Sequence, residues 1–436
     1  MRAVEIILAK RNGRTLDQSE IAFMVQGYTR GEIPDYQIAA WLMAICWRGM
    51  LAEETAALTL EMVRSGAHLN LAQATGLPFV GDKHSTGGVG DKTTLVVAPA
   101  VAAAGLPIGK MSGRGLGFSG GTIDKLEAIP GFKVSLSQGE FIRSVREVGL
   151  VVVAQSPDLA PADGKLYALR DVTGTVESLP LIASSIMSKK IAAGASGCVL
   201  DVKYGRGAFM KDLTAARALA TTMVEIGRQV GLPVRAVLSG MEQPLGYAVG
   251  NGLEVQEAIA TLRGGGPDDL WQVSRELGRE LLLLAGLAAE AGAAEAMLDE
   301  ARHSGAALAK LRAMVANQGG DVGYIDDPSR FPAAPVQQPL IASMGGYLVA
   351  VDAEALGHAS VSLGAGRLVK GAEIDHRVGF VLHKKVGDWV AAGDPLLTIH
   401  AANEQAAAAV SPALQAAYQF GPEPVTPPPL SNGVIS

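Results

Sequence analysis

Cysteine is nearly absent from this chain, which contains only Cys46 and Cys198. Two cysteines are too few for a disulfide framework or a cysteine-rich metal site. An excess of basic residues is also absent, because 37 lysines and arginines face 43 aspartates and glutamates, for a net charge of −6. The chain therefore has no surplus charge to neutralise a nucleic-acid backbone, and no basic run typical of a membrane-surface segment.

Long apolar runs are missing as well. The richest stretch, Leu281–Ala293, is interrupted by a glutamate and by glycines, and it is shorter than the roughly 18–20 apolar residues of a membrane span. Met1–Arg14 alternates charged and apolar residues and has no signal-peptide core. The 436 residues are 48% hydrophobic, enough for several domains and a large core. We expect a soluble, cytoplasmic protein with no nucleic-acid or membrane partner.

The first 66 residues carry helical patterns. Thr15 and Gln18 form a capping-box pattern that predicts a helix start. Pro34 predicts the start of another helix, which Gly49 ends. Glu53–Arg64 predicts one more. These residues are expected to form a small helical domain over 1–66 without chemistry of its own.

Short apolar runs alternate with helical patterns after Gly76. Strand-like runs lie at Leu77–Val80, Leu150–Ala154, Gly197–Val202 and Val234–Leu238, and helical patterns at Thr93–Ala104 and Leu213–Val230. This alternation is typical of an α/β layer with a mainly parallel sheet, expected over 77–155 and 195–335. The stretch Tyr167–Ala193 also has a helical pattern and can belong to either lobe.

The pattern changes again near Gly345, where glycine turns separate strand-like runs. These runs indicate a C-terminal α+β subdomain over 345–436. Lys385–Pro395 resembles half of a biotinyl/lipoyl-type β domain, but no lysine sits at an obvious hairpin tip, so we interpret it as scaffold. The last 16 residues contain five prolines and predict an extended tail.

The chain contains 53 glycines, and two glycine-rich loops among them also carry lysine and hydroxyl side chains. The first, 82–94, offers Lys83, Ser85 and Thr94 and leads into a helix, whose N-terminus favours an anion. Its lysine and serine precede the glycines, so it is not a P-loop. Taken alone, this segment also fits an ordinary glycine-rich loop that binds no ligand.

The second glycine-rich loop, 110–127, offers Lys110, Ser112 and Thr122 and begins about 27 residues after Lys83. Two such loops at strand ends are expected to converge on one crevice of an open sheet. They supply donors but no acidic metal motif, which favours a single phosphate as the ligand.

A third cluster follows in 169–190. The Arg170 guanidinium can bind a planar carbonyl group with two donors. Ser185 and Lys189 are four residues apart and so share a helix face. Lys190 points elsewhere and is expected to be solvated.

At these clusters the sequence resembles the thymidine and pyrimidine-nucleoside phosphorylases over nearly its whole length. The segments that carry the resemblance are Asp82–Asp91, Ser112–Glu127, Pro180–Ala193, Gly207–Asp212 and Gln243–Val249. The resemblance implies a helical domain, 1–66 completed by about 160–193, beside the α/β domain. It also implies a homodimer and a cleft that closes between the domains.

The resemblance further implies roles for individual residues in the attack of phosphate on C1′ of a pyrimidine nucleoside. His84, Arg170 and Lys189 would be catalytic, with His84 near the base O2 as proton donor or as stabiliser of the departing anion. Leu116 and Phe209 would pack on the base, core packing being the alternative. Phosphate would contact Lys83, Ser85, Thr94, Lys110, Ser112 and Thr122. The pyrimidine base would contact Arg170, Ser185 and Lys189.

The resemblance implies no organic cofactor. It does imply a structural monovalent cation, potassium. Its matching positions are the carbonyl groups of Gly90, Lys92, Leu245 and Ala248 and the carboxylate of Glu257. Glu257 has an alternative as an ordinary acid on a helix surface. Lysine is unusual at position 92; only its carbonyl oxygen is required there, which leaves the side chain free to point away.

Phe118-Ser119 replaces the usual His-Thr of the family signature, which points to an altered substrate preference or a weakened activity. The other polar positions are intact, so we expect an active enzyme. Lys110-Met111-Ser112 resembles the broad pyrimidine-nucleoside branch, so we expect reversible phosphorolysis of uridine, thymidine and deoxyuridine. The alternatives are a strict thymidine phosphorylase, a phosphoribosyltransferase of the anthranilate type, and a catalytically weakened nucleoside-binding relative.

Overall fold

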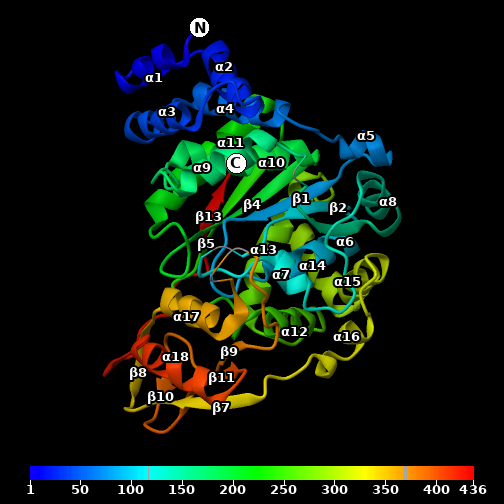
Figure 1. Cartoon of the computed structure of the whole chain (residues 1–436). Helices are drawn as coiled ribbons and strands as arrows, with labels where there is room; N and C mark the ends of the chain where they lie inside the picture. Colours follow the sequence, from blue (N-terminus) through cyan, green and yellow to red (C-terminus); the bar gives the residue numbers. More distant parts are fainter. Residues whose placement is uncertain (116, 157, 368, 370) are drawn as a thin grey trace.

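The computed structural model describes all residues from 1 to 436 except 116, 157, 368 and 370. A helical domain, a central α/β domain and a C-terminal domain follow one another along the long axis of the molecule (Figure 1). Among the described residues, no helix combines the length and apolar character needed to cross a membrane.

The helical domain combines two separate parts of the chain. Its core joins Trp41 and Leu58 to Ala162 and Leu181, all almost fully buried. The first part supplies α1 (Ala3–Arg11), α2 (Gln18–Thr29), α3 (Asp35–Arg48) and α4 (Ala52–Arg64), and the second part supplies α9 (Pro161–Asp171) and α10 (Leu179–Ala193).

The start of α2 corrects one prediction. Asp17, not Thr15, caps the helix, because its side chain accepts a hydrogen bond from the Glu20 backbone N–H and the Glu20 carboxylate accepts one from the Asp17 N–H. An aspartate caps a helix at least as well as a threonine. The predicted start at Pro34 and end at Gly49 are confirmed for α3.

A six-stranded sheet forms the centre of the molecule, in the order β13-β5-β4-β1-β2-β3. All neighbouring strands are parallel except β13, which is antiparallel to β5. The strands are β1 (Gly81–Ser85), β2 (Ile108–Ser112), β3 (Leu150–Ala154), β4 (Gly197–Tyr204), β5 (Val234–Gly240) and β13 (Ser431–Ile435).

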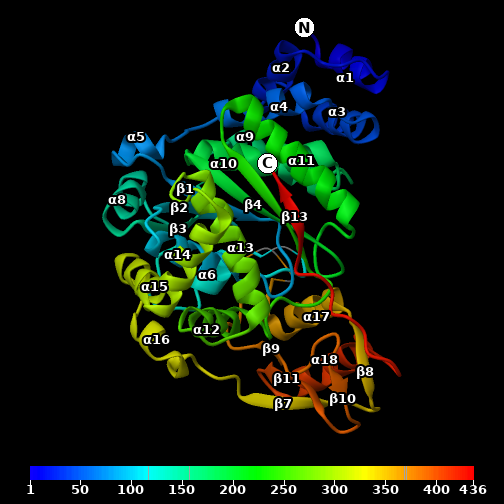
Figure 2. The same cartoon turned by 180° about the vertical axis from the view of Figure 1, so that it is seen from behind.

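Helices cover both faces of this sheet (Figures 1 and 2). Side chains of β4 alternate between them: Cys198 and Leu200 pack toward α10 and α11 (Leu213–Val230), whereas Val199 packs toward the opposite face. The opposite face is covered by α6 (Thr93–Ala103), α12 (Asn251–Leu262), α13 (Asp268–Leu284), α14 (Ala291–His303) and α15 (Ala306–Asn317). Smaller helices are α5 (Leu71–Thr75), α7 (Thr122–Leu126), α8 (Gln138–Val148) and α16 (Gly323–Asp326).

The first strand of the sheet lies later in the chain than its apolar signal. The prediction from Leu77–Val80 is wrong by four residues, because β1 is the polar segment Gly81–Ser85. This strand pairs with β2 and β4 on its two edges. Its polar side chains find buried partners, so the residues of the first glycine-rich cluster begin on the strand itself.

The C-terminal domain contains two small antiparallel sheets, in the orders β10-β8-β12 and β6-β9-β11-β7. The short β6 (Ala248–Val249) belongs to the central domain and pairs with β9, which joins the two domains. The other elements are β7 (Val336–Ile341), β8 (Gly346–Val351), α17 (Ala353–Ser360), β9 (Gly379–Leu382), β10 (Trp389–Val390), β11 (Pro395–Ala401), α18 (Glu404–Ala416) and β12 (Tyr418–Gly421).

The predicted tail is extended, but it is not free. Its last residues return to the central domain as β13 and cover the outer edge of β5, where the Gly240 N–H donates to the Leu430 carbonyl group at 2.9 Å. Pairing with the edge strand satisfies backbone groups on both segments. The proline-rich composition did not reveal this partner.

Candidate active site

The two glycine-rich loops leave neighbouring strands at the same edge of the sheet. Gly81 in β1 lies beside Ile108 in β2, and both strands run in parallel. His84 and Ser85 therefore end β1 near the point where Ser112 ends β2. The loop after β1 leads into α6 at Thr93, and the loop after β2 leads into α7 at Thr122.

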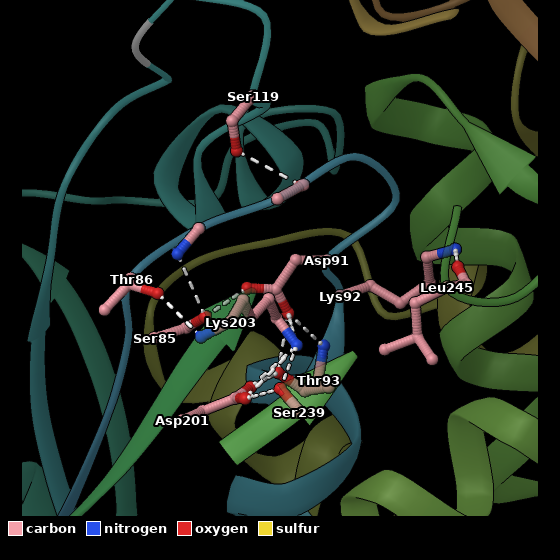
Figure 3. Close-up of polar contacts among 12 residues, drawn as sticks. Ser85, Thr86, Asp91, Lys92, Thr93, Ser119, Asp201, Lys203, Ser239 and Leu245 are labelled. Carbon is pink, nitrogen blue, oxygen red and sulfur yellow. Dashed lines mark hydrogen bonds and ion pairs between the residues drawn. The ribbon is translucent and has the colours of Figure 1, made fainter. Parts of the chain in front are cut away.

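One face of β1 carries a buried network of paired charges, of which Ser85, Asp91, Thr93, Asp201 and Lys203 are drawn in Figure 3. Asp91 accepts a hydrogen bond from the Ser85 hydroxyl at 2.5 Å and another from the Thr93 hydroxyl at 2.6 Å. Asp201 in β4 lies 3.1 Å from the Lys83 ammonium and 3.0 Å from the Lys203 ammonium. Each lysine on this face thus has a carboxylate partner.

The charges of this network stabilise one another. Burial alone raises the pKa of the Asp91 carboxyl, but Lys203 and Lys83 hold that pKa well below its usual range. The same two lysines lower the pKa of Asp201. The Lys83 ammonium donates to the Thr93 hydroxyl at 2.5 Å and faces Asp201, so it belongs to this network. A contact between Lys83 and phosphate stays a prediction.

Several lysines lie around His84. The Lys110 ammonium is buried and donates to the Lys83 carbonyl oxygen. Within the described part of the chain it forms no ion pair. Burial, with Lys190 close by, lowers the pKa of Lys110 to about 7. Burial and the nearby ammonium groups, Lys190 and Lys110 first, hold the pKa of His84 well below its usual range, so the imidazole is neutral near pH 7.

Lys190 departs from its prediction as a solvated residue. Its side chain is buried, and its ammonium donates to Asp82 at 2.9 Å and to the Met111 carbonyl oxygen at 3.0 Å. Lys190 therefore ties α10 to β1 and β2. The prediction is wrong because the face of α10 that carries Lys190 packs on the sheet and not against solvent.

Ser185 and Lys189 share a face of α10, as their spacing predicts. The Lys189 ammonium donates to the Ser185 hydroxyl at 3.0 Å and to Asp163 of α9 at 2.7 Å. Lys189 borders a cavity of about 520 Å³, which is also lined by Met111, Gln155, Lys190 and Asp163. The other oxygen of Asp163 is buried without a partner among the described residues.

Arg170 directs its guanidinium at the backbone. The group donates to the carbonyl oxygens of Thr175, Leu181 and Val176 at 3.2, 3.1 and 2.6 Å. It is almost fully buried, and burial lowers its pKa. In this arrangement Arg170 holds the connection between α9 and α10, and its contact with a pyrimidine base stays a prediction.

The remaining predicted residues lie around the same edge of the sheet. Thr94 and Ser112 are buried, and Thr122 begins α7. Phe209 is 37% exposed and stacks on Phe118 with ring centroids 5.3 Å apart. Leu116 lies outside the described residues.

Phe118 and Ser119 both make contacts that link separate parts of the structure. Phe118 is buried between Phe209 and His358, whose ring lies 5.5 Å away. The Ser119 hydroxyl donates to the Gly88 carbonyl oxygen at 3.1 Å and thereby connects the two glycine-rich loops (Figure 3). The pair thus joins these loops to each other and to α17.

The positions expected to hold potassium already hold a cation of the chain itself. The side chain of Lys92 does not point away but donates to the Leu245 carbonyl oxygen at 2.8 Å (Figure 3). It also donates to the Ala248 carbonyl oxygen at 2.8 Å and to Glu257 at 2.5 Å. Lys92 is fully buried in this position. The residues present therefore do not fit a separate potassium ion at these oxygens.

Sequence reasoning missed several charged residues of the site, namely Asp91, Asp163, Asp201 and Lys203. A signal for two of them was available: Asp201 and Lys203 are two residues apart in a strand and so lie on one face. Asp163 carries no comparable local signal, because its partner Lys189 is far away in the sequence.

Comparisons with known proteins agree with these observations. Residues 78–308 match the a/b domain of the glycosyl transferase family, and residues 4–66 match its helical bundle domain. Residues 347–421 match the pyrimidine nucleoside phosphorylase C-terminal domain.

Similar proteins cover nearly the whole chain. The pyrimidine-nucleoside phosphorylase of Geobacillus stearothermophilus is 54% identical over 405 residues, which is 93% of each chain. The enzyme of the same name from Staphylococcus aureus strain N315 is 55% identical over 400 residues, 92% of each chain. The anthranilate phosphoribosyltransferase of Thermus thermophilus shares the fold, with a TM-score of 0.58 and 19% identity over 72% of this chain and 99% of that one.

Proposed function

The chain belongs to the pyrimidine-nucleoside phosphorylase family of glycosyl transferases, and we propose that it phosphorolyses uridine, thymidine and deoxyuridine reversibly to the free base and (2-deoxy)ribose 1-phosphate. In this reaction a phosphate oxygen attacks C1′ as the bond from C1′ to the base breaks. The bonding electrons leave with the base as an anion, which then takes up a proton.

The observation that carries this proposal is the buried ammonium of Lys110. A buried charge without an ion-pair partner is costly, and burial, with Lys190 nearby, lowers the pKa of this ammonium to about 7. An incoming phosphate would supply the missing negative charge and would return Lys110 to its protonated form. The loop that leads into α6 lies next to this point, and a helix N-terminus favours an anion.

His84 is suited to the leaving base. With its pKa held well below the usual range, the imidazole is neutral, so it donates a hydrogen bond without carrying a charge into a group of lysines. Donors aimed at the atom where charge develops stabilise the transition state more than the ground state. Lys189, which donates a hydrogen bond to Ser185, borders the cavity beside Met111. The volume of this cavity is typical of small-molecule sites, and the cavity would receive the nucleoside.

The test is to incubate the purified protein with uridine or thymidine, with and without phosphate, and to quantify free base. We expect phosphate-dependent release of both uracil and thymine. Release from thymidine alone would replace the broad specificity with that of a strict thymidine phosphorylase. No release from either nucleoside by the folded protein would contradict the proposed activity.

We also propose that the enzyme is a cytoplasmic homodimer that pairs through its helical domain. Tyr36, Met43 and Trp47 on α3 are 74%, 47% and 79% exposed, and a group of exposed apolar side chains favours a protein interface. Both cysteines are free, which suits a reducing compartment. Light scattering of the wild type and of Trp47→Glu tests the dimer, and a variant that is still dimeric would contradict this interface.

A further inference from the structure

The Lys92 ammonium is enclosed by oxygen atoms in the manner of a bound metal ion. An ammonium group has three N–H donors, and here they serve the carbonyl oxygens of Leu245 and Ala248 and the carboxylate of Glu257. The Lys92 side chain is 0% exposed, and that of Glu257 is 10% exposed. The group is thus saturated with acceptors and shielded from water.

The surrounding backbone fits this arrangement closely. The second oxygen of Glu257 accepts hydrogen bonds from the N–H groups of Tyr247 and Ala248 at 2.9 and 3.0 Å. Gly246 has a φ of +72°, and a Cβ atom there would collide with the Glu257 carboxylate and lie 3.0 Å from the Lys92 nitrogen. A second cation would have to enter a space that is already filled and would face a like charge.

Lys92 also stands at a structural junction. It precedes α6 directly, next to Asp91, which holds Ser85 and Thr93. Two of its acceptors, the carbonyl oxygens of Leu245 and Ala248, lie just before β6 and at its first residue, and β6 is the strand paired with the C-terminal domain. A cation at this point therefore fixes the first glycine-rich loop to the central domain and, through β6, to the C-terminal domain.

We propose that the Lys92 ammonium is a built-in monovalent cation that replaces a bound potassium ion in this chain. Lys92 is a positioning residue: it holds the loop that carries Asp91 and does not touch the substrate. The consequence is that folding and phosphorolysis of this protein are independent of the monovalent cation in solution. The phosphorolysis readout rests on the proposed function, whereas the folding readout does not.

The first experiment compares thermal unfolding of the wild type in potassium chloride and in choline chloride at equal ionic strength. We expect the same Tm in both salts. Lys92→Thr removes the ammonium and leaves the oxygen ligands, so its Tm is expected to fall by several degrees in choline chloride and to recover in potassium chloride, because an ion that binds only the folded state stabilises it.

Lys10→Thr is the matched control. Lys10 is also a buried lysine, but its ammonium contacts the two carboxylate oxygens of Glu54, at 2.7 and 2.8 Å, and the residue lies in α1 of the helical domain. This variant is expected to lose stability equally in both salts. Lys92→Met, which fills the space without a charge, is expected to be destabilised and not to recover in potassium.

Soaking crystals in thallium(I), a heavy substitute for potassium, gives a readout that needs no activity. We expect a thallium peak among Leu245, Ala248 and Glu257 in Lys92→Thr and none there in the wild type. A lower Tm of the wild type in choline chloride, a thallium peak at this place in the wild type, or a Lys92→Thr variant without any potassium response would each overturn the proposal. Absence of phosphorolysis in every salt would count against the proposed function alone.

Discussion

Two groups of lysines beside β1 are buried in different ways. On the face toward α6, Lys83 and Lys203 lie against Asp201. Lys110 of β2 is buried against the Lys83 carbonyl oxygen and forms no ion pair among the described residues, whereas Lys190 and Lys189 of α10 are paired with Asp82 and Asp163. Lys110 therefore lacks the carboxylate partner that the other buried lysines of this region have.

This difference separates the lysines that build the site from the one that is suited to act in it. A buried ammonium with a carboxylate partner stabilises the arrangement of the loops and has little attraction left for a ligand. A buried ammonium without one is unfavourable until an anion arrives. We therefore assign the paired lysines to the shape of the glycine-rich loops and propose Lys110 as the phosphate-binding lysine.

The largest expected effect concerns the paired lysines. Asp201→Ala leaves Lys83 and Lys203 without their shared carboxylate, and breaking a buried ion pair from one side costs about 3–5 kcal/mol. Urea denaturation should show a loss of this size in the free energy of unfolding. Lys110→Met is the contrasting variant, because it removes a charge without an ion-pair partner; its unfolding free energy should equal or exceed that of the wild type. Equal losses in both variants would end the distinction between paired and unpaired lysines.

The next effect concerns catalysis. In the proposed reaction, His84→Ala would remove a donor aimed at the developing charge of the base, and losing one such donor lowers kcat by about 10²–10³-fold. Steady-state kinetics with uridine should show this fall with little change in the KM for phosphate. A rise in that KM at unchanged kcat would assign His84 to phosphate binding instead.

A smaller effect concerns the pH dependence of anion binding by Lys110. The folded pKa of about 7 lies below the unfolded value, so Lys110 loses its proton, and with it its attraction for anions, as the pH rises through 7. Sulfate does not titrate in this range, so its inhibition constant against phosphate should rise by about tenfold per pH unit above 7 in the wild type. In Lys110→Met the inhibition should be weak and independent of pH. A flat wild-type profile would be inconsistent with a titrating Lys110.

The smallest effect tests the connection between the glycine-rich loops. Ser119→Ala removes the hydrogen bond to the Gly88 carbonyl oxygen, and such a bond contributes about 1 kcal/mol. Thermal unfolding should show a modest decrease in Tm and unchanged substrate preference. A switch in the uridine-to-thymidine ratio would instead give Ser119 a direct role in specificity.

Regular elements were predictable where the local signal decides them. Leu213–Val230 and Leu150–Ala154 have the predicted bounds in α11 and β3. β1 was misplaced because its polar residues are satisfied by distant partners, Thr93 and Asp201 for Lys83 and Lys190 for Asp82. The docking of the C-terminal tail on β5 was unpredictable for the same reason.

The candidate site was predictable as a set of residues but not as a set of contacts. The pattern of four residues correctly brought Ser185 and Lys189 together. It could not reveal that Arg170 holds backbone carbonyls or that Lys92 occupies its own oxygen cage. Such contacts join segments that are far apart in the sequence, and spacing carries no information about them.

Calorimetric titration with inorganic phosphate measures whether the unpaired ammonium of Lys110 binds phosphate. Wild type, Lys110→Met and Lys10→Met should be compared at pH 7. We expect one phosphate site per chain in the wild type, weakened by at least about tenfold in Lys110→Met, a difference of about 1.4 kcal/mol, and unchanged in Lys10→Met. Equal phosphate affinity in wild type and Lys110→Met would rule out Lys110 as the phosphate-binding lysine.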